Sequence, residues 1–188
     1  MSDDSLRNVG ITELTRTDAP PIKLHYRYLT PACYDLSIHH ETDSWRIELT
    51  LKTFMEPLER VSDSRFYEEF VEEPRAFAAE LDGKQVGWIE LGYHKWNNRM
   101  RIWEILVREE YRRRGIGTLL MDHAVKIAKE KGARALVLET QSCNAPAITF
   151  YLKYGFELIG FDSTAYSNDD IQKKEVRLEM GLRLAASS

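Results

Sequence analysis

The chain has 188 residues, of which 43% are hydrophobic, so it is long enough for one domain with a buried core and an extension. Its 30 acidic residues outnumber its 26 Lys and Arg, and a net charge of -4 argues against a general affinity for nucleic acid. The 2 cysteines are too few for a disulfide framework or a cysteine metal site. The acidic N-terminus and the lack of a long apolar run predict a cytoplasmic protein that does not bind membranes.

The first part of the chain, residues 1–44, combines prolines with scattered polar residues. We predict that it forms an N-terminal arm, partly extended or disordered, and that the main folded domain covers residues 45–188. Apolar and polar residues alternate after Trp45, which predicts a half-buried strand. A short helix with one apolar face is predicted over residues 62–71, and Pro74 ends it.

Three antiparallel strands are predicted next. Residues 76–81 and 86–93 are apolar runs joined by Asp82 and Gly83, and this dipeptide between two such runs is a strong hairpin signal. After a second turn, residues 100–107 supply the third strand.

The pattern then changes to helices and a parallel strand. Apolar residues at helical spacing predict a helix over 116–128, and the apolar run 135–140 is typical of a buried parallel strand. A strand, helix and strand at this spacing form a βαβ crossover, so residues 100–107 and 135–140 should be parallel neighbours. A second helix is predicted between Asn144 and Gly155. A last antiparallel pair completes an α/β fold with a mixed, mostly antiparallel sheet: residues 156–161 and 175–184.

The turn before the first of these helices combines three arginines with two glycines: Arg112, Arg113, Arg114, Gly115 and Gly117. Unpaired N–H groups at a helix N-terminus bind phosphate, and glycines let the anion approach the backbone. A single pyrophosphate therefore accounts for the arginines without nucleic acid. The P-loop motif is excluded because no Lys-Ser or Lys-Thr follows, and the Rossmann fingerprint fails because Leu120 replaces its third glycine.

The motif R-x-x-G-x-G in this turn resembles the acetyl-CoA pyrophosphate loop of the GNAT N-acetyltransferase superfamily. The segment from Leu138 to Tyr166 is similar to the streptothricin acetyltransferase branch, although Trp103 stands where that branch usually has an acidic residue. The resemblance implies the GNAT fold, with a splayed parallel strand pair at the centre of the sheet. Six residues match the superfamily's helix pattern N-x-x-A-x-x-F-Y-x-x-x-G-F: Asn144, Ala147, Phe150, Tyr151, Gly155 and Phe156.

The resemblance also implies an activity: direct transfer of acetyl from acetyl-CoA, used as a co-substrate without a metal, to an amine. Main-chain N–H groups of the arginine–glycine turn would hold the diphosphate, and those near the end of the preceding strand would polarise the thioester carbonyl. Asn144 would cap its helix and touch the pantetheine arm. The expected donor-binding residues are Leu106, Val107, Arg112, Arg113, Arg114, Gly115, Ile116, Gly117, Thr118, Asn144 and Tyr154.

Two proton transfers accompany this reaction. The CoA thiolate must gain a proton, and Tyr151 occupies the family's tyrosine position; Tyr154 is the alternative, and a purely structural core aromatic is the other interpretation of Tyr151. The acceptor amine must lose a proton, because an alkylamine has a pKa near 10.4. We expect Glu104 to be the base, although a solvated strand carboxylate is an equally open interpretation of it, and Glu90 and Glu139 on neighbouring strands are alternatives for the base.

The acceptor is expected to be a small cationic amine, streptothricin-like or polyamine-like, contacted by Glu90, Glu139, Asp162 and Tyr166. Other acidic residues would bias the site towards cations: Glu68, Glu69, Glu72, Glu73, Asp169 and Asp170. Two alternatives remain, which are a protein N-terminus or lysine as acceptor and a non-catalytic module that binds acyl-CoA. Nucleic acid is the least favoured partner.

Some reactive residues are not assigned a role. Cys143 lies near the expected donor site, but no neighbouring residue suggests a base, so we predict a buried bystander thiol. The histidines show no ligand spacing. The oligomeric state stays open, with a homodimer as one expectation.

Overall fold

The computed structural model describes residues 8–16 and 24–185. The chain divides into two compact units, and each is considered by itself. The first unit comprises Met1–Tyr26, Asp63–Leu138 and Leu182–Ser188, and the second comprises Arg27–Ser62 and Glu139–Gly181.

The first unit contains a mixed sheet. Its strands are neighbours in the order β1 (Val9–Leu14), β4 (Arg75–Leu81), β5 (Lys84–His94), β6 (Arg99–Val107) and β7 (Ala135–Gln141), whose last residues belong to the second unit. The pairs β1–β4, β4–β5 and β5–β6 are antiparallel, whereas β6–β7 is parallel. The predicted mixed α/β fold with three consecutive antiparallel strands and one parallel crossover is confirmed.

The two predicted turns of this sheet are also confirmed. Asp82 and Gly83 both adopt positive φ, 51° and 73°, as a two-residue hairpin turn between β4 and β5 requires. The short 3-10 helix η2 (Lys95–Asn97) then joins β5 to β6.

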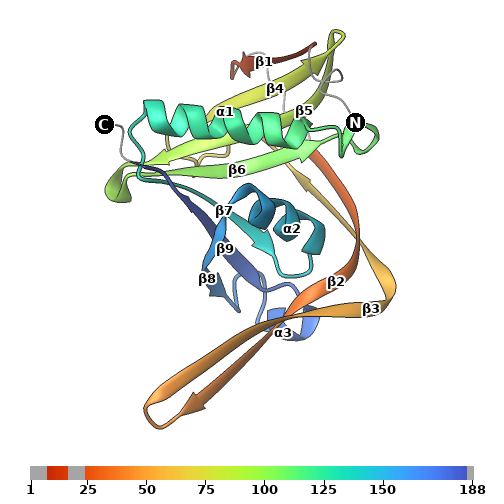
Figure 1. Ribbon diagram of the computed structural model, residues 1–188, viewed down its shortest axis with the longest axis vertical. Coiled ribbons are helices and arrows are strands. Elements are labelled where there is room, and N and C mark those ends of the chain that lie inside the picture. The colour runs from red at the N-terminus through yellow and green to blue at the C-terminus, as the bar shows by residue number, and fades with distance from the viewer. Residues whose placement is uncertain (1–7, 17–23, 186–188) are drawn as a thin grey trace. The chain divides into compact units, whose positions relative to one another are not determined.

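Helix α1 (Ile116–Glu130) lies against one face of the sheet formed by β4, β5 and β6 (Figure 1). A Cβ on Gly87 would stand 3.2 Å from Leu120 Cδ1 and 3.3 Å from Ile116 Cγ2, so glycine at this position favours the close approach of α1 to β5. The helix buries the following side chains: Ile116, Leu120, Met121, Ala124, Ile127 and Ala128.

The opposite face of this sheet is covered by irregular chain where a helix was predicted. Strand β3 (Ser44–Ser64) continues to Ser64, and residues 65–74 form turns, so the predicted helix over 62–71 is wrong. The side chain of Phe66 is held by the sheet rather than by a helix face, because it joins a buried cluster: Leu14, Leu24, Phe66, Ala76, Ala78 and Trp88.

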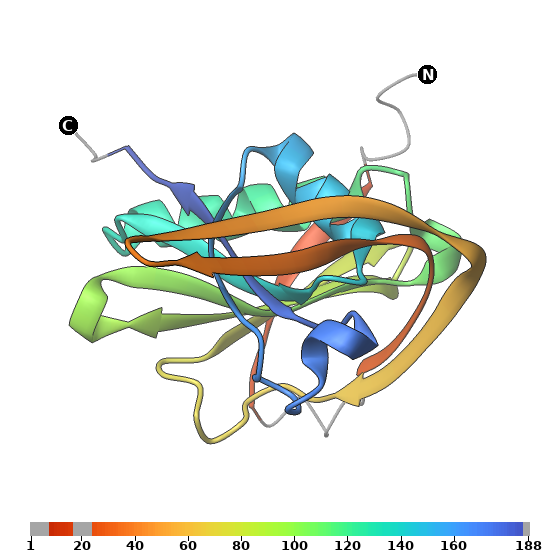
Figure 2. The same cartoon turned by 90° about the horizontal axis from the view of Figure 1, so that it is seen from below.

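The second unit contains most of the hairpin of β2 (Leu24–Glu41) and β3, which run side by side in both views (Figures 1 and 2), whereas residues 24–26 and 63–64 of these strands belong to the first unit. It also contains α2 (Ala145–Tyr154), α3 (Asp170–Lys173) and the antiparallel pair of β8 (Glu157–Asp162) and β9 (Arg177–Arg183). Its core joins the hairpin to α2 and β9 through Leu36, Ile148, Val176 and Leu178. No helix in the described part of the chain has both the length and the apolar character that a membrane span needs.

In the described part of residues 1–44 the chain forms strands β1 and β2. Strand β1 pairs with β4 inside the sheet, and the predicted division at residue 45 falls next to the turn between β2 and β3. The predicted strand after Trp45 is confirmed, but it is not half-buried, because Trp45 is 66% exposed and Leu51 is 56% exposed.

Gly92 on β5 gives a test of this packing. A Cβ there would stand 2.6 Å from Trp103 Nε1 and 2.8 Å from Val71 Cγ1. Gly92→Ala should therefore destabilise the protein by roughly 1–3 kcal/mol, the usual cost of overpacking, measured by denaturant unfolding. Gly10→Ala on β1 is the control, because nothing lies within 4 Å of its added Cβ. Equal stability of the two variants would contradict this packing.

Candidate active site

The arginine–glycine turn leads from β6 into α1, as predicted. Gly115 is the N-cap of α1 with φ of 87°, in the left-handed region that favours glycine, and it provides no side-chain cap. The first N–H groups of an α-helix have no partner within the helix, and here they belong to Ile116, Gly117 and Thr118. This uncapped, glycine-rich helix start has the partial positive charge and the open backbone that a diphosphate needs.

The three arginines of the turn differ in what they do. Arg112 Nε donates a hydrogen bond to the Val107 carbonyl at 3.1 Å, which closes the turn back on the end of β6. Arg113 and Arg114 are exposed, and the Arg114 guanidinium lies 5.3 Å from the centre of the Tyr111 ring. Arg112 therefore shapes the turn, whereas the other two offer charge to a ligand.

The end of β6 presents its backbone in two directions. The Arg108 N–H donates to the Val86 carbonyl of β5, and the Leu106 carbonyl stands 3.1 Å from the place of a Cβ on Gly87. Because backbone groups alternate along a strand, the Val107 N–H points away from β5. The parallel ladder with β7 ends at Ile102, so β6 continues beyond its last residue paired with β7, in agreement with the expected splay. Of the two predicted oxyanion donors, Val107 has the more suitable orientation.

Two of the predicted carboxylates lie directly opposite each other. Glu90 of β5 pairs in register with Glu104 of β6, and the register shifts just after them. Both side chains lie on the sheet face opposite α1, because they share that face with Trp88 of the buried cluster. Glu104 accepts hydrogen bonds from the Tyr26 hydroxyl at 2.5 Å and from the Ser64 hydroxyl.

Glu90 is buried, with 1% of its surface exposed, and its Oε1 accepts the Tyr67 N–H at 2.6 Å. Burial, opposed by the Tyr67 hydrogen bond and aided by the charges of Glu104 and Glu68, raises the pKa of Glu90 to about 7. Near neutral pH Glu90 is therefore partly protonated. The sequence pattern contains no signal for Tyr26, Ser64 or Tyr67, because they lie in the segments interpreted as an arm and a helix.

The second unit holds the predicted acid and the residues around it. Asn144 is the N-cap of α2, and its side chain accepts the Ala147 N–H at 3.3 Å, as predicted. Tyr151 is buried among aromatic rings, with ring centres 5.5 Å from Phe150 and 5.9 Å from Phe156. Tyr154 is half-buried and also lies beside Phe156, at 6.1 Å.

Two predicted acceptor residues of the second unit contact each other. The Tyr166 hydroxyl donates to Glu139 Oε1 at 3.1 Å, and Arg177 Nε lies 3.0 Å from Glu139 Oε2. Burial and the Glu139 charge raise the pKa of Tyr166, so its hydroxyl stays protonated. Asp162 is engaged elsewhere, since its Oδ1 accepts the Thr164 N–H at 2.9 Å and closes a local turn.

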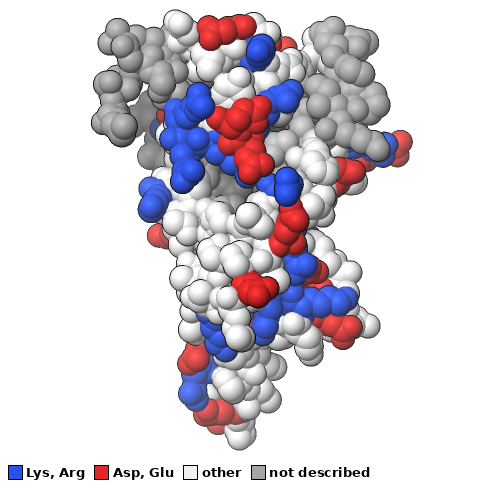
Figure 3. Space-filling model, turned by 90° about the vertical axis from the view of Figure 1, so that its right-hand side faces the viewer, with Lys and Arg blue, Asp and Glu red and all other residues white. Residues whose placement is uncertain are grey.

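The other acidic residues expected to attract cations are largely engaged in structure. Glu68 pairs with Arg65, and Glu73 pairs with Lys95 and Lys131. Asp170 is fully buried and accepts the Tyr166 N–H at 2.9 Å. On the face drawn in Figure 3, acidic and basic side chains are interspersed rather than gathered into one basic surface.

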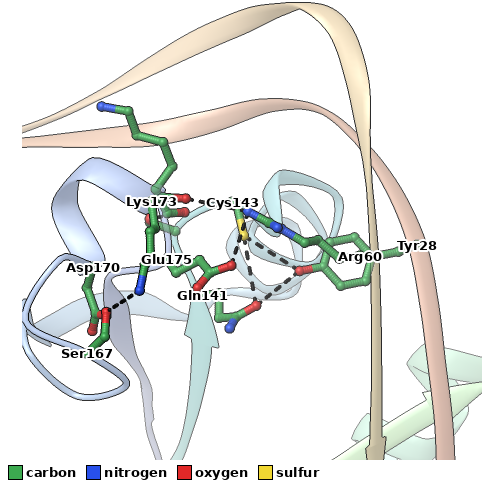
Figure 4. Close-up of polar contacts among 10 residues, drawn as sticks. Tyr28, Arg60, Gln141, Cys143, Ser167, Asp170, Lys173 and Glu175 are labelled. Carbon is green, nitrogen blue, oxygen red and sulfur yellow. Dashed lines mark hydrogen bonds and ion pairs between the residues drawn. The ribbon is translucent and has the colours of Figure 1, made fainter.

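Cys143 lies in a buried polar cluster of the second unit (Figure 4). Its Sγ is 3.8 Å from Gln141 Oε1 and 3.7 Å from the Tyr28 hydroxyl, beside the ion pair of Arg60 and Glu175. This burial agrees with the expectation of a bystander thiol. Across residues 8–16 and 24–185, no three His, Cys, Asp or Glu side chains are grouped as metal ligands would be.

The chain is similar to known acetyltransferases. A family model described as the acetyltransferase (GNAT) family matches residues 40–156. A streptothricin acetyltransferase of Streptomyces lavendulae is 43% identical over 89 residues, which are 47% of this chain and 47% of that protein. The matched segment spans about half the length of the curated streptothricin acetyltransferases that the chain resembles.

Two solved structures resemble nearly all of the chain. A nourseothricin acetyltransferase matches with a TM-score of 0.75 and 28% identity, covering 95% of this chain and 99% of that one. A Bacillus anthracis protein described as a streptothricin acetyltransferase, solved in complex with acetyl coenzyme A, matches with a TM-score of 0.69 and 28% identity. That match covers 94% of this chain and 98% of the other.

Proposed function

Because this chain belongs to the acetyltransferase (GNAT) family, we propose that it transfers acetyl from acetyl-CoA to a primary amine of a small cationic molecule of the streptothricin type. The observation that carries the proposal is the uncapped helix start at Gly115, placed directly after the strand that carries Glu104. The streptothricin and nourseothricin acetyltransferases among its relatives support the class of acceptor.

The donor would be held at the start of α1. Acetyl-CoA supplies the activated acetyl thioester. The N–H groups of Ile116, Gly117 and Thr118 would bind its diphosphate, with charge from Arg113 and Arg114. The Val107 N–H would donate to the carbonyl oxygen as negative charge develops there.

Two residues would carry the proton transfers. The Tyr26 and Ser64 hydroxyls hold the Glu104 carboxylate in place. Glu104 would accept the proton of the ammonium group directly or through a water. Tyr151 would protonate the departing thiolate, since a phenol with a pKa near 10 is a suitable acid for a thiol leaving group. Glu139 and Tyr166 would contact the acceptor.

Acetyl-CoA consumption with a panel of amines tests this function. We expect turnover with streptothricin and, more weakly, with polyamines, because these carry primary amines and positive charge. A protein N-terminus or a lysine peptide as the preferred acceptor would replace the small-molecule assignment. Acetyl-CoA binding without turnover on any amine would instead leave a non-catalytic binding module.

Gly117→Glu tests the donor site by binding alone. Acetyl-CoA should raise the melting temperature of the wild type, since a ligand bound only by the native state stabilises it. The substituted side chain and its charge would fill the phosphate site and abolish this shift. Gly10→Glu is the matched control, because its position on β1 has nothing within 4 Å of an added Cβ. An undiminished shift in Gly117→Glu would contradict the assignment of the loop.

Tyr151→Phe tests the proposed acid. The substitution keeps the ring among Phe150 and Phe156 and removes the hydroxyl, so folding and acetyl-CoA binding should persist. The kcat should fall by roughly 10²–10⁴, the usual contribution of a positioned general acid. Tyr154→Phe is the comparison, and a loss confined to that variant would transfer the role to Tyr154.

We also propose that the protein assembles as a homodimer through the hairpin. Odd-numbered residues of β3 share one face, on which Leu49 packs against the core of the second unit. Trp45, Ile47 and Leu51 on the same face are 66%, 49% and 56% exposed, an apolar row of the kind that marks association surfaces.

Light scattering after gel filtration tests this assembly. The wild type should elute with the mass of a dimer, and Ile47→Lys should produce monomer because a charge would be buried in the interface. Glu48→Lys on the other face is the control and should remain dimeric. A wild-type monomer at micromolar concentration would contradict the proposed dimer.

A cytoplasmic location is proposed as well, supported by two free, buried cysteines.

A further inference from the structure

The last residue of β3 and the turn after it contact both carboxylates of the β5–β6 pair. Ser64 donates its hydroxyl to Glu104, and three residues later the Tyr67 N–H donates to Glu90 at 2.6 Å. Tyr67 has φ of 60°, in the left-handed region, which is strained for a residue with a bulky side chain. Its hydroxyl also donates to the Leu14 carbonyl at 2.6 Å.

A strained turn persists only where its surroundings hold it. Here the turn is held at its backbone by Glu90 and at its side chain by the Leu14 carbonyl at the end of β1. Arg16, in the chain after β1, lies 5.8 Å from the ring centre. Loss of the Glu90 bond would let Tyr67 relax to a common backbone conformation and displace Ser64 from Glu104. Glu90 therefore controls the position of the Ser64 hydroxyl, which contacts the proposed base. Neither acetyl-CoA nor the acceptor amine needs to touch Glu90 itself.

We propose that Glu90 is a positioning residue of the acetyl transfer, which fixes the Tyr67 turn over the sheet and leaves Glu104 as the single carboxylate that receives the acceptor's proton. This inference rests on the proposed function. It differs from the expectation that Glu90 contacts the acceptor, because 1% exposure leaves almost no surface for a substrate.

Burial, helped by nearby negative charge, keeps one of the two carboxyls largely protonated below pH 7. Glu90 faces Glu104 from β6, Glu68 and Tyr67 from the covering segment, and Arg16 from the chain after β1, with Ala76 opposite on β4. The pKa of Glu90, about 7, lies above its ordinary value of 4.5 chiefly because of burial. The folded protein therefore binds more protons than the unfolded chain between about pH 4.5 and pH 7, and this contribution to stability is lost as the pH rises through 7.

Three variants separate positioning from proton acceptance. Glu90→Gln keeps an oxygen for the Tyr67 N–H and cannot ionise, so its kcat/KM at pH 6.5 should stay within about threefold of wild type. Glu90→Ala removes the bond and should lower kcat by about 10- to 100-fold, with the KM for acetyl-CoA unchanged, because the base is displaced. Glu104→Gln should lose roughly 10²–10⁴ in kcat. Glu80→Gln on β4 is the control for an acid-to-amide change in the same sheet.

The split between kcat and KM and the rescue by the conservative Gln variant supply the readout that a merely structural role would not move. Glu90→Ala equal to wild type would overturn the inference. So would a Glu90→Gln variant as inactive as Glu104→Gln, since Glu90 would then be the proton acceptor.

Thermal unfolding makes this inference separable from the proposed function. The melting temperature of Glu90→Gln minus that of wild type should increase by about 3 °C or more from pH 5 to pH 8.5. Glu90→Ala should melt below Glu90→Gln at each pH, because only the amide keeps the Tyr67 bond. Wild type without turnover on any amine would reject the proposed function, whereas equal melting temperatures of Glu90→Ala and Glu90→Gln would reject the role of Glu90 in holding the Tyr67 turn.

Discussion

Strand β6 contains one extra residue, Trp103, between Ile102, which pairs with Leu91, and Glu104, which pairs with Glu90. A bulge of this kind bends a strand and re-aims the side chains that follow it. Here it sets Glu104 opposite Glu90 on the face away from α1, and the parallel ladder with β7 ends at Ile102. The freed end of β6 then leads into the arginine–glycine turn, so the carboxyl pair, the Val107 N–H and the phosphate site all depend on this register.

The sequence predicted the elements whose signals are local. Asp82 and Gly83 require no distant partner to make a hairpin turn. The glycines at the start of α1 indicate an anion site through backbone chemistry alone. The cap of α2 at Asn144 was equally accessible, because its bond to Ala147 lies within one helical turn.

The errors occurred where distant contacts override local pattern. Residues 62–71 have the spacing of a short helix, but Phe66 is drawn into the cluster with Leu14 and Trp88, and the Tyr67 N–H binds Glu90 instead of a helical carbonyl. The opposition of Glu90 and Glu104 depends on a bulge, and no sequence period reveals which strand position will carry one. The sequence indicated Glu104 as a candidate base, but it did not predict that Tyr26 and Ser64 would donate hydrogen bonds to it.

Several departures from the rules of stable packing gather on one face of β5 and β6. Tyr67 holds a left-handed backbone, Glu90 is a buried acid, and Gly92 admits Trp103 at a distance where any side chain would collide. Among the described residues, Trp103 Nε1 is a buried donor with no hydrogen-bond partner. Each of these features costs stability, and natural proteins tend to keep such costs at sites under functional constraint. The α1 face of the same sheet also has a close glycine, Gly87, and a buried nitrogen without a partner, His123 Nε2. What distinguishes the other face within the first unit is therefore its buried acid, Glu90, paired in register with Glu104.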